Sequence, residues 1–134
     1  MPSPSEKESL VRKYDAIASA YATHYRDPAA VARRHVALLA RWGRRLDPGA
    51  TVLELGCADG LVTEALAQAG FRVTAVDLSP AMIEAARRRL DRAGLGAKLL
   101  VADIDEFETS ATFDAVLAMM RNFFHYSSDP SSTV

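Results

Sequence analysis

The stretch that decides the fold is Val52-Leu53-Glu54-Leu55-Gly56-Cys57-Ala58-Asp59-Gly60. A short apolar run predicts a buried strand, and a loop of small residues and a helical pattern over 61–69 follow it. A ligand can approach the backbone of such a loop closely, because no large side chain lies in the way. The order of strand, small-residue loop and helix therefore predicts a ligand-binding turn of an α/β fold.

The glycine spacing in this loop narrows the class of ligand. A loop that holds the pyrophosphate of a dinucleotide reads G-x-G-x-x-G. Here Gly56 and Gly60 are four residues apart, and Ala58 lies between them. This spacing argues against a pyrophosphate site, and with it against a nicotinamide-dependent oxidoreductase.

Strands and helices alternate along the rest of the chain. Strand patterns cover 51–55, 71–76, 97–101 and 113–118, and helical patterns cover 61–69 and 79–93. Strands separated by helices of this length form a parallel sheet with right-handed crossovers. The sequence therefore predicts a doubly wound α/β domain with four strands.

The segment before the first strand predicts two helices. A helix over about 6–25 places one set of apolar residues on a single face: Leu10, Tyr14, Ile17, Tyr21 and Tyr25. Asp27-Pro28 is a helix start signal, and the second helix is expected to reach about Leu46 before the turn Asp47-Pro48-Gly49. We expect one domain over 1–134, with disorder at the Pro/Ser-rich ends, 1–5 and 127–134.

The composition is that of an ordinary globular domain. Hydrophobic residues make up 49% of the 134 residues, charged residues 25%, and the formal net charge is -1, so neither nucleic acid nor a membrane is an expected partner. Arg87-Arg88-Arg89 and Arg92 lie in a helical pattern and are interpreted as a solvated face rather than a phosphate-binding patch. Cys57 is the only cysteine, so no internal disulfide is needed and a cytoplasmic location is expected.

Two aspartates follow neighbouring predicted strands. Asp77 ends the second strand, 21 residues after Gly56, where an acid can accept hydrogen bonds from two ribose hydroxyls. It can also cap the helix that begins near Pro80, with Ser79 sharing that work. Asp103 ends the third strand beside the same crevice and can accept from an adenine amine, while Ile104 can cover a ring face; a simple turn aspartate is the alternative.

Taken together, these segments resemble the class I S-adenosylmethionine-dependent methyltransferases, especially those that act on small molecules. The likeness covers roughly 14–126. Residues 54–60 resemble the family's first motif, an acid followed by spaced glycines, with Ala58 in place of the middle glycine. Residues 76–82 resemble the second motif, 102–104 the third, and 113–118 the fourth strand. The family fold is Rossmann-like with the strand order 3-2-1-4, which we expect here.

The resemblance implies a set of residues that bind S-adenosylmethionine and its product S-adenosylhomocysteine. Gly56 and Gly60, with Cys57 and Ala58 between them, would let the methionine part lie against the loop, and Glu54 beneath would hold loop amides or a water. Asp77 would bind the ribose. The other implied contacts to the cofactor come from Tyr14, Tyr21, Leu78, Met82, Asp103, Ile104 and Met119, with Asp15 and Ala18 belonging to the same N-terminal pattern as the tyrosines. Ordinary packing of an amphipathic helix is the alternative role of each tyrosine.

The implied reaction is direct displacement of a methyl group by an oxygen, nitrogen or carbon nucleophile of a small molecule. The methyl group is already activated, so the protein mainly supplies alignment and exclusion of water. No metal-ligand spacing is present in the sequence, and none is required. His125 is the best candidate for a general base, although a lone histidine is more often structural.

The pattern departs from the family near its end, because relatives carry a longer sheet. A four-stranded sheet exposes one long side of its last strand. Three explanations follow: a fragment or truncated gene, which we favour; a homo-oligomer formed across that edge; or a short relative that binds cofactor or a partner without turnover.

Overall fold

The computed structural model describes residues 3–18, 27, 30–31, 33–34, 36–37, 41 and 47–118. The chain order is α1 (Pro4–Ile17), β1 (Thr51–Leu55), α3 (Leu61–Gln68), β2 (Arg72–Asp77), α4 (Pro80–Ala93), β3 (Lys98–Val101) and β4 (Ala115–Ala118). The four strands form one parallel sheet in the order β3-β2-β1-β4. This confirms the predicted α/β class and its strand order.

Local capping explains where α4 begins and ends. The Ser79 side chain accepts a hydrogen bond from the Met82 amide at 3.1 Å, and Pro80 follows in the first turn. Gly94 ends the helix with φ +68°, a left-handed conformation that a glycine adopts without strain. Asp27 also accepts the Ala30 amide at 3.0 Å, as its predicted role at a helix start requires.

The N-terminal helix begins earlier than the sequence predicts. Ser3 and Glu6 form a capping box, in which each side chain binds the backbone amide of the other residue, so α1 starts at Pro4. The expected disorder is therefore wrong for Ser3, Pro4 and Ser5. The rest of that prediction, residues 1–2 and 127–134, lies outside the described residues, as do Tyr21 and Tyr25.

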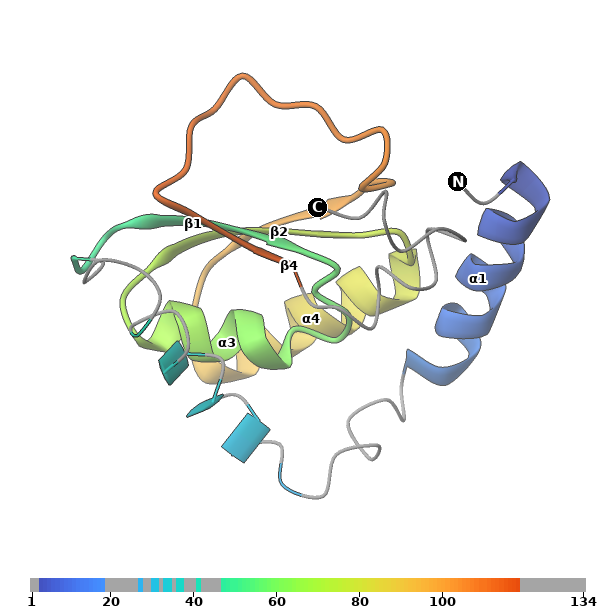
Figure 1. Cartoon of the computed structure of the whole chain (residues 1–134). Coiled ribbons are helices and arrows are strands. Elements are labelled where there is room, and N and C mark those ends of the chain that lie inside the picture. Colours follow the sequence, from blue (N-terminus) through green and yellow to red (C-terminus); the bar gives the residue numbers. More distant parts are fainter. Residues whose placement is uncertain are drawn as a thin grey trace.

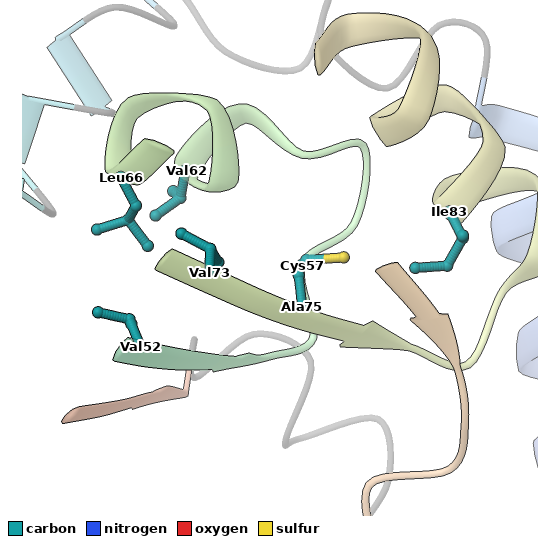
Figure 2. Packing of buried hydrophobic residues seen from close by; sticks show 7 residues of the cluster. All are labelled: Val52, Cys57, Val62, Leu66, Val73, Ala75 and Ile83. Atoms are coloured by element: carbon teal, nitrogen blue, oxygen red, sulfur yellow. The ribbon is translucent and has the colours of Figure 1, made fainter. Parts of the chain in front are cut away.

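Helices α3 and α4 cover one face of the sheet, and residues 102–114 arch away on the other side as turns and irregular chain (Figure 1). Alternate residues of the two central strands face these helices. Figure 2 shows the resulting core cluster, which consists of Val52, Cys57, Val62, Leu66, Val73, Ala75 and Ile83. Burial of these apolar side chains is the main force that holds the helices against the sheet.

The register brings the carboxyl ends of all four strands to one edge of the sheet. Leu55 pairs with both Val76 and Ala118, and Asp77 pairs with Val101. The loop 56–60 and the segments after β2 and β3 therefore emerge side by side. In an open parallel sheet this is the edge at which ligands bind.

Strand β4 is an edge strand in the part of the chain that the structure describes. It pairs with β1 alone, and the Val116 side chain is 59% exposed. The unpaired backbone of an open strand edge is a potential site for further pairing, whereas the Val116 side chain lies on the face of the sheet opposite α3 and α4. A further strand could therefore pair with β4 and extend the sheet.

Gly60 provides a test of the close approach between the loop and α4. A Cβ at Gly60, where φ is +82°, would lie 2.8 Å from the Ala86 Cβ, whereas a Cβ at Gly94 would meet nothing within 4 Å. Both alanine substitutions introduce left-handed strain, but only Gly60→Ala also overpacks the helix contact. Chemical denaturation should show that Gly60→Ala lowers the free energy of unfolding by about 1–3 kcal/mol more than Gly94→Ala. Equal losses would contradict the packing role.

Candidate functional site

The buried carboxylate of Asp77 occupies the centre of this edge. One of its oxygens accepts the Ala58 amide at 2.9 Å, and the other accepts the Ser79 amide at 3.0 Å. Burial raises the pKa of Asp77, the negative charge of Asp15 adds to this, and the amides of Ser79, Ala58 and Leu78 oppose it. Asp77 thus joins the end of β2 to the loop after β1 and to the start of α4.

The small-residue loop is held by further hydrogen bonds within the protein. The amides of Gly56 and Cys57 both donate to the Val76 carbonyl, at 2.7 and 3.1 Å, and the Gly60 amide donates to the Cys57 carbonyl at 3.0 Å. Ala58 adopts φ +50°, a conformation that costs a residue with a side chain about 1–2 kcal/mol. These bonds fix the loop before any ligand arrives.

Glu54 lies beneath the loop on the helix-covered face of β1, where it is 1% exposed. Its carboxyl oxygen accepts a hydrogen bond from the Thr63 hydroxyl of α3 at 2.5 Å, and the loop amides or water that the resemblance implies for Glu54 stay a prediction. Burial raises the pKa of Glu54 to about 8; the charge of Asp77 acts in the same direction, and the Thr63 bond opposes both. At neutral pH the Glu54 carboxyl is therefore mostly protonated and ties the strand to the helix.

Asp103 is paired with a residue far away in the sequence. Its carboxylate forms an ion pair with the Lys7 ammonium of α1 and accepts the Asp105 amide at 2.9 Å. Lys7 also lies 3.6 Å from the Asp105 carboxylate. The Asp103 hydrogen bond raises the pKa of Lys7. Helix α1 thus reaches the acid that the sequence assigns to an adenine amine.

A second contact fixes α1 near its other end. One Asp15 oxygen accepts the Ser79 hydroxyl at 2.5 Å and the Ala81 amide at 3.1 Å. Apolar packing surrounds this contact, because α1 lies beside α4 (Figure 1) and one cluster unites the buried Ala18, Ala58 and Met82 with Tyr14, Ile17 and Ala81. Ala58 and Met82 therefore pack against α1, and Tyr14 packs against the same apolar cluster, while its contact with a cofactor stays a prediction.

The remaining predicted site residues occupy different environments. The Cys57 side chain belongs to the core cluster (Figure 2), and burial raises the pKa of its thiol well above the usual range, so only its backbone can serve a ligand. Leu78 and Ile104 are half-buried in the segments that follow β2 and β3. Tyr21, Met119 and His125 lie outside the described residues.

The sequence did not indicate that Arg89 of α4 connects the small-residue loop to α3. Its guanidinium binds the Asp59 carboxylate at 3.0 Å and carbonyl at 3.1 Å, and it lies 3.3 Å from Glu64 of α3. The predicted solvated face holds for Arg87, Arg88 and Arg92, which are exposed, but is wrong for Arg89. Asp59 is 4% exposed, so its charge needs this partner. The one sequence feature that could have indicated this contact is Asp59, an acid between two small residues of the loop.

The described residues include neither a metal-site cluster nor a membrane-spanning helix. No group of three or more histidine, cysteine or acidic side chains there has the arrangement of a metal site. None of the described helices combines the length and apolar character needed to cross a membrane.

Comparison with known proteins identifies the family. The model of the methyltransferase domain matches residues 52–134. The chain belongs to this methyltransferase family. A ubiquinone biosynthesis O-methyltransferase of Methylocella silvestris is 44% identical over 80 residues, which cover 59% of this chain and 31% of that protein. Its counterpart in Xanthomonas axonopodis pv. citri is 34% identical over 93 residues, 67% of this chain and 38% of that protein. The chain thus spans about a third of the length of these curated relatives.

Solved structures agree with the fold. S-adenosylmethionine-bound CalS10, an amino pentose methyltransferase from Micromonospora echinaspora, is 31% identical with a TM-score of 0.58 over 75% of this chain and 40% of that one. The magnesium protoporphyrin IX methyltransferase of Synechocystis PCC 6803 has a TM-score of 0.70 at 20% identity, over 84% of this chain and 57% of that one. The second likeness concerns the fold alone.

The raised pKa of Glu54 predicts a stability that depends on pH. Between the ordinary value of 4.5 and about 8 the folded protein keeps a proton that the unfolded chain loses, so stability falls as pH rises through this range. Glu54→Gln keeps an acceptor for Thr63 but cannot ionise. Chemical denaturation at pH 5.5 and 8.5 measures this difference. Between the two pH values, the free energy of unfolding of the wild type should fall by roughly 2–5 kcal/mol more than that of Glu54→Gln. Glu84→Gln, at an exposed position of α4, should behave like the wild type, and a Glu54→Gln profile as steep as the wild type would contradict the assignment.

Proposed function

We propose that the chain is the S-adenosylmethionine-binding part of a methyltransferase that methylates an oxygen, nitrogen or carbon atom of a small molecule. The single observation that supports this most is the Asp77 carboxylate, buried at the carboxyl edge of the sheet and bonded to the loop of the family's first motif. The family match over 52–134 and the names of the similar methyltransferases point to the same chemistry.

The residues at the edge suit the parts of this cofactor. Asp77 has carboxylate oxygens that can take further hydrogen bonds from ribose hydroxyls, since each oxygen has two lone pairs. Asp103 offers an anionic acceptor for the adenine amine, and the half-buried Leu78 and Ile104 offer apolar contacts for its ring. The backbone of 56–60 supplies a rigid wall for the methionine part.

Bound S-adenosylmethionine supplies a methyl group already activated by the positive sulfur. The chain's own contribution is binding and orientation: Asp77 and the loop fix the position of the cofactor, and α1 limits access of water to it. His125 and Met119 remain proposed neighbours of the reaction. Glu54 acts from below, by fixing β1 to α3.

The proposal extends to partners and location. The acceptor is a small molecule, with neither nucleic acid nor a membrane as partner, and the location is cytoplasmic, where a fold without disulfides is stable. The outer backbone edge of β4, which is unpaired among the described residues, supports pairing with further strands, either from a longer chain or from a second copy. The same observation favours the second candidate function, a module that binds cofactor or a partner without turnover.

Calorimetric titration with S-adenosylmethionine and S-adenosylhomocysteine tests the proposal. We expect both to bind with micromolar dissociation constants, and methyl transfer to an acceptor would then separate the enzyme from the non-catalytic module. A folded chain that binds neither compound would contradict the proposed function.

Asp77→Ala should weaken binding of S-adenosylhomocysteine by about 1–3 kcal/mol, the range for hydrogen bonds to a charged group. The matched control is Asp114→Ala, because Asp114 also holds a backbone amide, that of Thr51 at 2.8 Å, but at the opposite end of the sheet. Both variants should lose stability in thermal unfolding, and only Asp77→Ala should lose affinity. An equal affinity of the two variants would remove the ribose assignment.

A further inference from the structure

The ion pair between α1 and the β3 edge occupies a proposed ligand contact. Lys7 and Asp103 are 96 residues apart, and their side chains are only 16% and 12% exposed. One Asp103 oxygen accepts from the Lys7 ammonium and the other from the Asp105 amide. Each oxygen of the acid assigned to the adenine amine therefore already accepts one hydrogen bond, and an adenine amine would have to share the Asp103 carboxylate with the Lys7 ammonium or displace it.

The other end of α1 is held by different residues. Asp15 accepts from the Ser79 hydroxyl and the Ala81 amide, at the start of α4. These two donors are not among the groups that we assign to a ligand. Helix α1 thus has two attachments. The first, from Lys7, uses the proposed ligand acceptor Asp103, and the second, from Asp15, uses no group that is assigned to a ligand.

We propose that α1 is a displaceable cover whose Lys7 ammonium occupies the place of the ligand's amine at Asp103 until an adenosine ligand takes it. This inference rests on the proposed function. A neutral amine competes poorly with an ammonium for a partly buried carboxylate, because a hydrogen bond between two charged groups is the stronger one. Binding therefore requires the first turns of α1 to move away from Asp103, while the Asp15 contact acts as the fixed end.

Removal of the competing cation should raise affinity. The experiment titrates S-adenosylhomocysteine, which carries no sulfonium charge, into the wild type, Lys7→Met and Arg12→Met in low and high salt. Arg12 is an exposed cation of the same helix and serves as the charge-matched control. In low salt we expect Lys7→Met to bind about fivefold more tightly than the wild type, which corresponds to about 1 kcal/mol, and Arg12→Met to bind like the wild type. High salt should narrow the difference by screening the ion pair.

Hydrogen exchange provides a second readout, independent of affinity. Addition of the ligand to the wild type should reduce protection of the amides in the first turns of α1 and preserve that of Ala81. Equal or weaker binding by Lys7→Met, or unchanged exchange in α1, would overturn the inference while leaving the proposed function intact. If none of the three folded proteins binds, the proposed function fails, and the inference fails with it.

Discussion

The two hydrogen bonds that Asp77 accepts, from the Ala58 and Ser79 amides, connect the three segments on which the site depends. Through them the end of β2 fixes both the loop after β1 and the first turn of α4. A buried carboxylate needs such donors, because burial without hydrogen bonds would cost more than the fold can supply. The same residue is therefore both a structural link and the group best placed to receive a ligand.

Other buried acids near Asp77 are stabilised in different ways. Glu54 remains mostly protonated at neutral pH and bonds Thr63, whereas Asp59 stays paired with Arg89. Among the described residues, no buried side-chain nitrogen or oxygen lacks a hydrogen-bond partner. The three acids thus have different partners: Glu54 bonds a hydroxyl, Asp77 accepts two backbone amides and Asp59 binds a guanidinium.

Helix α1 makes both apolar and polar contacts with the segments at the carboxyl edge of the sheet. Its apolar residues pack on Ala58 and Met82, and its charged residues contact Asp103 and the start of α4. A cover held by a few polar contacts opens at lower free energy than a core helix. Ligand access and protection from water can then be provided by the same element.

The sequence by itself determined the alternation of strands and helices, the small-residue loop, and the positions of Asp77 and Asp103, because periodicity, caps and strand ends are local properties. It also indicated the strand order through the family resemblance. Only the tertiary structure decided that Lys7 meets Asp103, that Thr63 meets Glu54, and that Arg89 joins Asp59 to Glu64. These contacts join separate elements across the fold, and no local pattern encodes which charged side chain will lie opposite which acid once the helices have packed against the sheet.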